Sequence, residues 1–183
     1  MKLHVPALVL ACAAAVHGGA LKAPLAAKPA LLTSVGQSAD VEMVKVLMDR
    51  AKLPFQSNPK IKPEELAATG AKTLVLAIGG SSKGLGAAGL SAEVELKRAK
   101  AVMAEAHKHG MKILGLHVGG ETRRGELSDK FIEAAVPQCD YLIVVADGNK
   151  DGLFTKLCGG RIPMDSVDKI SKAGEPLAQA FIK

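Results

Sequence analysis

Four short aliphatic runs, each ending in a glycine-rich or polar turn, constrain the fold of this chain more than any other feature. They begin the segments 31–38 (LLTSVGQS), 73–86 (TLVLAIGGSSKGLG), 113–121 (ILGLHVGGE) and 141–151 (YLIVVADGNKD). Short continuous apolar runs are typical of strands buried on both faces, as in parallel sheets that helices cover. The runs therefore predict buried strands, each followed by a turn that could hold a ligand.

Helical patterns and weaker strand patterns fill the intervals between these runs. We expect helices over residues 40–52, 63–70, 92–109, 127–135, 151–157 and 175–181, and edge strands within 55–61 and 161–164. This alternation predicts a single α/β domain with a three-layer, doubly wound, Rossmann- or flavodoxin-like, mostly parallel sheet of five or six strands. Ligands of such sheets bind beyond the carboxyl ends of the strands, where the strand order reverses.

The composition limits the possible partners. The formal net charge is +6, but the chain has four Phe, one Tyr and no Trp, so base stacking on aromatic rings is not expected and we predict no nucleic-acid partner. Lysines and arginines lie beside glutamates along the expected helices, as in residues 93–98, which favours a solvated surface. Nothing in the composition predicts the oligomeric state.

The N-terminus predicts a signal peptide over residues 1–20. Lys2 precedes an apolar run over residues 3–16, which is too short and too alanine-rich for a stable membrane span, and Gly18, Gly19 and Ala20 offer a cleavage position. We expect residues 21–30 to be an Ala/Pro/Lys-rich linker or a transit-like segment, and residues 31–183 to form the domain. The protein is then periplasmic or secreted, or reaches an organelle through a signal plus a transit segment.

Cleavage of this signal leaves two cysteines, Cys139 and Cys158, which the expected strand and helix bring to one edge of the sheet. A disulfide is possible in an oxidising compartment, and two buried free thiols are the alternative.

The glycine-rich turn at Gly80, Gly84 and Gly86 resembles the nucleotide-binding turn of short-chain dehydrogenases. Bare glycines beside a helix start can hold a phosphate, which would make NAD(P) the cofactor. However, no acidic residue ends the next run, Tyr141 lacks a lysine four residues on, and we expect the following helix to start only after residue 91. An NAD(P)-binding oxidoreductase is therefore an alternative to the main interpretation.

A possible calcium loop begins at Asp147. Asp147, Asn149 and Asp151 alternate as the first ligands of such a loop do, but the twelfth position is Cys158 where the loop needs a glutamate. We therefore predict no tight metal site, and a turn that caps the next helix explains these residues equally well.

The turn after the third run brings His117, Glu121, Arg123 and Arg124 to the binding edge. Arginines there suit a carboxylate or a phosphate. The alternative is that the histidine is merely packed and that the arginines pair with nearby glutamates.

The main prediction is a protein that binds a small anionic or polar molecule across its strand-end turns. If it is an enzyme, the candidate acid/base groups are His117, Glu121 and Asp147. The residues expected to bind the ligand are Gly36, Gln37, Ser38, Gly79, Gly80, Ser81, Ser82, Lys83, Gly84, Gly86, Gly119, Gly120, Arg123, Arg124 and Asn149. A non-catalytic, partner-binding module, whose turns only shape a surface, is the further alternative.

Four segments also carry a wider resemblance: LLTSVGQSADVEMVKVL, AIGGSSKGLGAAG, HVGGETRRGELSDKFI and YLIVVADGNKDGLFTKL. In this order they are similar to an exported family catalogued as a domain of unknown function, DUF6305. The resemblance spans residues 31–157 and implies export and a compact α/β fold, without an established activity.

Overall fold

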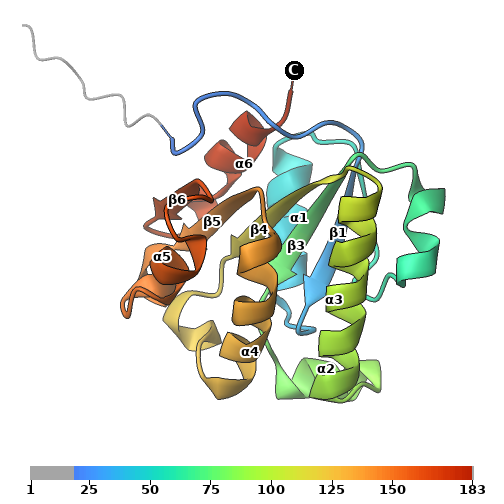
Figure 1. Cartoon of the computed structure of the whole chain (residues 1–183). Coiled ribbons are helices and arrows are strands. Elements are labelled where there is room, and N and C mark those ends of the chain that lie inside the picture. Colours follow the sequence, from blue (N-terminus) through green and yellow to red (C-terminus); the bar gives the residue numbers. More distant parts are fainter. Residues whose placement is uncertain (1–18, 183) are drawn as a thin grey trace, which may run out of the picture.

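The computed structural model describes residues 19–182, which form one six-stranded, all-parallel sheet with helices on both faces (Figure 1). The strands are β1 (Ala30–Val35), β2 (Phe55–Ser57), β3 (Thr73–Ile78), β4 (Lys112–His117), β5 (Tyr141–Val145) and β6 (Met164–Val167). The helices are α1 (Asp40–Arg50), α2 (Ser82–Ala88), α3 (Ala92–Lys108), α4 (Glu126–Ala135), α5 (Leu153–Cys158) and α6 (Gly174–Ala180). The predicted α/β, doubly wound fold is confirmed.

The strand order is β2-β1-β3-β4-β5-β6, so the chain moves from β1 to one side and then crosses to the other. The switch in direction lies between β1 and β3, whose last residues, Val35 and Ile78, are register partners. In an open parallel sheet this is the place where ligands bind. The turns that follow β1 and β3 therefore decide whether the usual crevice is open.

Aliphatic burial holds the three layers together. Every residue of β1 and β3 is buried, which agrees with strands covered on both faces. One core cluster joins the sheet to α2, α3, α4 and α5, and the other joins it to α1 and α6. Each face therefore has a continuous apolar layer, with little aromatic content.

Three elements differ from the sequence prediction. The helix expected over residues 63–70 is two short 3₁₀ helices, η1 (Pro63–Glu65) and η2 (Ala67–Thr69). The glycine-rich segment is itself helical, because the Ser81 hydroxyl caps α2 by accepting from the Gly84 N–H at 3.1 Å. The last strand begins at Met164, at the end of the stretch where we expected it. Gly159 and Gly160 both have positive φ, so the chain must turn there before it can pair with β5.

The segment expected as a linker lies against the domain. The N–H groups of Leu25 and Ala26 donate to the Ala180 carbonyl at 3.0 and 2.9 Å, and Ala26 pairs with Phe181. In Figure 1 this blue segment runs across the top of the sheet. Residues 1–18, which hold most of the expected signal peptide, lie outside the described residues.

Two further observations concern the chain from residue 19 to 182. Cys139 and Cys158 are both buried and free, and burial raises the pKa of each thiol. None of the helices in this range combines the length and the apolar character that a membrane span requires.

Candidate functional site

The turns after β1 and β3 bind each other at the switch point. Gln37 and Gly80 form an isolated antiparallel bridge, and the Ser81 N–H donates to the Gly36 carbonyl at 3.0 Å. The Gly79 N–H donates to the Val35 carbonyl at 2.9 Å. The place where this fold usually opens a crevice is therefore filled by its own backbone.

Close approach explains two of the glycines in these turns. A Cβ atom on Gly84 would lie 1.7 Å from the Gln37 carbonyl oxygen, and one on Gly36 would lie 2.6 Å from the Gly79 carbonyl oxygen. The N–H groups of Gly80 and Gly84 donate to the hydroxyls of Ser128 and Ser81. The amides that would hold a phosphate are thus already bonded within the protein.

The other predicted residues of the β1 and β3 turns divide into buried and exposed groups. Ser38 is buried, and its hydroxyl accepts from the Asp40 N–H at 3.3 Å. Ser82, Lys83 and Gly86 are exposed on α2. In the described part of the chain no ion pair involves Lys83, which leaves its ammonium group available to solvent.

A buried ion pair anchors the β1 turn to α3. The Arg98 guanidinium donates to both Glu95 carboxylate oxygens, at 2.7 and 2.9 Å, and Glu95 is fully buried. The same carboxylate accepts from the Gly36 N–H and from the Gln37 amide, both at 3.0 Å. Residues 93–98 thus contribute a buried network as well as the solvated surface that we expected.

A second ion pair crosses the carboxyl edge of the sheet. Arg123 Nε donates to Asp40 Oδ2 at 3.2 Å and so joins the β4 turn to the start of α1. A Cβ on Gly79 would lie 2.6 Å from Arg123 Cγ, and one on Gly119 would lie 2.6 Å from Asp40 Oδ2. A side chain at either glycine would clash with the ion pair, so glycine is needed at both positions. Arg123 is already paired with a carboxylate of its own chain.

His117 lies beneath the turns. It is fully buried at the end of β4, with Nδ1 3.0 Å from the Ile78 carbonyl and Nε2 3.2 Å from the Gly120 carbonyl. Its ring packs against Phe154 at a centroid distance of 4.8 Å. Burial lowers the pKa of His117, and the two carbonyl contacts oppose that shift. These contacts suit a residue that positions the turn η3 (Gly120–Arg123).

Arg124 is held by two carboxylates. Its guanidinium donates to Asp129 at 2.7 and 3.1 Å, to Asp151 at 3.0 and 2.8 Å, and to the Gly148 carbonyl. The hydrogen bonds that Arg124 donates to Asp151 and then to Asp129 raise the pKa of Arg124, and Arg124 lowers the pKa of Asp151 to about 2. Every N–H group of the Arg124 guanidinium already donates a hydrogen bond within the protein. A ligand anion would therefore have to replace one of these partners.

A hollow of about 270 Å³ lies beside Arg124, at the carboxyl ends of β4 and β5. It lies between η3 and η5 (Ala146–Asn149), which contact each other. We call it the strand-end hollow; its lining residues are Glu121, Arg124, Gly125, Asp129, Asp147, Lys150 and Asp151. Four carboxylates and two cations therefore face one small volume.

The residues of the possible calcium loop act mainly as caps. Asn149 Oδ1 accepts from the N–H groups of Phe154 and Thr155, and Asp151 accepts from the Leu153 N–H. Within residues 19–182 no three His, Cys, Asp or Glu side chains are placed to hold a metal ion.

Five residues that build this edge were missed in the sequence: Asp40, Glu95, Arg98, Ser128 and Asp129. Glu95 carried a detectable signal, because it lies on the stripe that Ala99, Val102 and Ala106 continue along the buried side of α3. A carboxylate on such a stripe indicates a buried partner. Asp40 gave no comparable signal, since its partner lies 83 residues away.

Comparison with known proteins gives one match. A sequence family described as a domain of unknown function (DUF6305) matches residues 27–181. No curated protein and no solved structure matches the chain significantly.

Proposed function

The chain belongs to the DUF6305 family, and we propose that it binds a small polar ligand in the strand-end hollow. The observation that carries this proposal is the arrangement of four carboxylates and two cations around about 270 Å³ at the binding edge of the sheet. A volume of this size suits a ligand of metabolite size or smaller.

The charges in the hollow favour a ligand that donates hydrogen bonds, such as one with an amino group, over a bare anion. Arg124 is neutralised by Asp129 and Asp151, and the carboxylates outnumber the cations. Asp147 is exposed and, among the described residues, has no ion-pair partner. It is therefore the carboxylate that is most available to a ligand ammonium.

The exposed ion pair between Glu121 and Lys150 lies at the hollow and can separate when a ligand binds. Both side chains are 64% exposed, and exposed ion pairs contribute only about 0–1 kcal/mol. A ligand can thus replace this contact at little cost. His117 does not line the hollow, so the proposal includes binding and no acid/base reaction.

A second candidate function is the non-catalytic, partner-binding module. The observation that favours it is the closed switch point, where the turns of β1 and β3 satisfy each other's backbone groups. The same observation argues against an NAD(P)-binding oxidoreductase, because the amides of Gly80 and Gly84 are not free for a pyrophosphate.

A thermal-shift screen tests the main proposal. The mature chain is heated with amino acids, small amines, carboxylates, phosphorylated metabolites, nucleotides and NAD(P). We expect saturable stabilisation by an amine-bearing class, which corresponds to about 2.7 kcal/mol at a hundredfold excess over Kd. The gain is lost in Asp147→Asn and kept in Lys83→Ala, since Lys83 lies outside the hollow.

Two outcomes would overturn this proposal. A flat screen on folded protein would favour the partner-binding module. A ligand whose effect disappears in Lys83→Ala but persists in Asp147→Asn would move the site to the glycine-rich turn.

A further inference from the structure

A row of lysines lies along the amino edge of the sheet, at the end opposite the strand-end hollow. Lys28, Lys52, Lys72 and Lys112 lie at, or within three residues before, the first residues of β1, β2, β3 and β4. These four strands are adjacent in the order β2-β1-β3-β4. Because neighbouring strands are about 4.8 Å apart, the lysines follow one another across the sheet.

Backbone hydrogen bonds join the segments that carry Lys28, Lys72 and Lys112. The Lys72 N–H donates to the Pro29 carbonyl at 2.8 Å, and the Lys112 N–H donates to the Lys72 carbonyl at 3.3 Å. All four lysines are exposed. Lys112 pairs with Asp140 at 2.7 Å, whereas among residues 19–182 no ion pair neutralises the other three.

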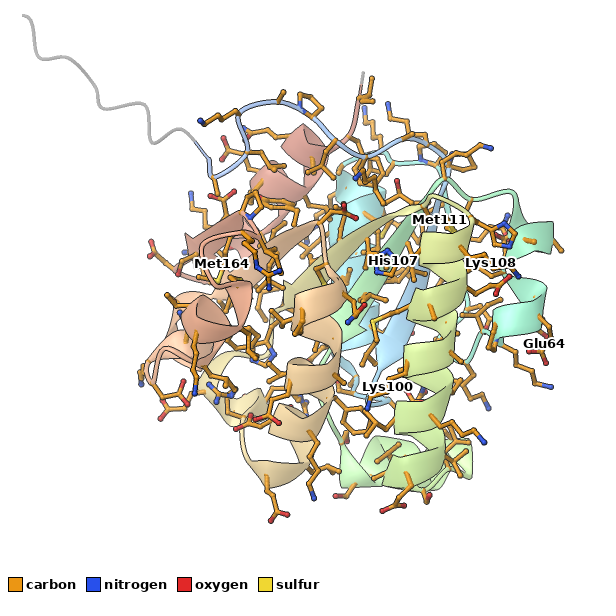
Figure 2. All side chains as sticks on the ribbon, viewed as in Figure 1. Glu64, Lys100, His107, Lys108, Met111 and Met164 are labelled. Atoms are coloured by element: carbon orange, nitrogen blue, oxygen red, sulfur yellow. The ribbon has the colours of Figure 1, made fainter. Side chains whose placement is uncertain are left out.

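Helix dipoles explain other cations of this edge but not the whole row. Arg50 and Lys108 lie in the last turns of α1 and α3, where positive charge offsets the negative helix end. Lys28 and Lys72 follow no α-helix. Figure 2 shows Lys108 and Met111 where α3 ends, toward the top of the view, which is the amino edge.

Apolar side chains lie beside the row. A hollow of about 490 Å³ is lined by Leu21, Pro24, Phe181 and Ile182, among others, and Ile182 is 53% exposed. The Ile182 N–H donates to the Ala26 carbonyl at 2.9 Å, two residues before Lys28. Cations next to exposed apolar groups suit the interface of a lipid bilayer, whereas an acidic soluble polymer requires only the cations.

We propose that the amino edge docks on a bilayer surface that carries anionic lipid headgroups. The lysine row contacts the headgroups, and the apolar hollow meets the boundary of the acyl chains. Residues 19–29, which connect the expected leader to β1, lie along this same edge (Figure 1). The proposal is independent of any ligand in the strand-end hollow.

Co-sedimentation of the mature chain with vesicles tests this docking. We expect binding to phosphatidylglycerol/phosphatidylcholine vesicles, weaker binding at high salt, and none to phosphatidylcholine alone. Each lysine near an anionic surface contributes about fivefold in affinity. The variant Lys28→Gln/Lys52→Gln/Lys72→Gln should therefore bind roughly a hundredfold more weakly.

A matched variant controls for net charge. Lys60→Gln/Lys97→Gln/Lys100→Gln removes three exposed lysines away from the amino edge and should bind as the wild type does. Thermal unfolding checks that both variants are folded. Equal losses in both variants, or no binding to anionic vesicles, would overturn the proposal. Binding to soluble polyphosphate but not to vesicles would assign the edge to an acidic polymer instead.

Discussion

Glycine has two different uses at the carboxyl edge, although the sequence shows the same residue each time. Gly36, Gly79, Gly84 and Gly119 leave space that other atoms of the protein occupy. Gly86 has open space around it. The resemblance to a nucleotide-binding turn did not distinguish Gly84 from Gly86, because spacing alone does not show which atoms approach each glycine.

Substitutions at Gly84 and Gly86 separate the two uses. Gly84→Ala places a Cβ against the Gln37 carbonyl, which forces the two turns apart, and should destabilise the protein by about 1–3 kcal/mol. Gly86→Ala lies in a helix without a clash and should stabilise it by about 0.5–1 kcal/mol. Urea unfolding of both variants measures the difference. Equal effects would contradict this account of the turn.

Arg124 makes a prediction that depends on pH. Arg124→Met removes hydrogen bonds to Asp129, Asp151 and Gly148 and should cost about 1–3 kcal/mol at pH 7. Arg124 lowers the folded-state pKa of both carboxyls, that of Asp151 to about 2. A lowered pKa contributes stability that is complete above the unfolded value of about 3.9 and is lost as the pH falls toward about 2.

The stability gap between wild type and Arg124→Met should therefore narrow as the pH falls from 5 to 2. Denaturant titrations across this range measure it. Lys130→Met is the control, because its pair with Glu126 is exposed and should contribute little at any pH. A gap that stays constant with pH would show that the loss comes from packing and not from the ion pairs.

At the scale of elements, α3 holds the end of β1 in place through Glu95. Glu95→Ala leaves Arg98 without its partner and the Gly36 N–H unbonded, and should destabilise the protein by about 3–5 kcal/mol. Lys97→Ala, on the exposed side of the same helix and without an ion-pair partner among the described residues, should change the stability by less than about 0.5 kcal/mol. A small effect at Glu95 would show that the turn is held by other contacts.

The elements themselves could be predicted because their signals are local. The apolar run at Thr73–Ile78 predicts a buried strand. Ser91 as a cap and Gly110 as a stop predict the two ends of α3. The edge strand β6 lies further along the chain than the stretch 161–164 where we expected it. The residues there are only half-buried, so their apolar pattern is weak. The contents of the site could not be predicted in the same way. The ion pair between Arg123 and Asp40 forms only when the folded sheet brings the two residues together, so no local sequence pattern predicts it.

At the scale of the whole molecule, the two ends of the sheet differ in charge. The strand-end hollow gathers four carboxylates, and the amino edge carries the lysine row. The strands between them are up to six residues long, roughly 20 Å. Docking of the amino edge on a membrane would thus leave the hollow facing away from the bilayer, open to ligands in the surrounding solution.

The pairing of Ala26 with Phe181 places the two ends of the described chain next to each other. A short peptide can therefore join them, and the ring can be reopened at Gly89, which is exposed between α2 and α3 at the carboxyl edge. Such a circular permutant would keep every strand neighbour while moving both termini away from the amino edge. A fluorescent protein or affinity tag could then be attached without covering the surface that we assign to the membrane.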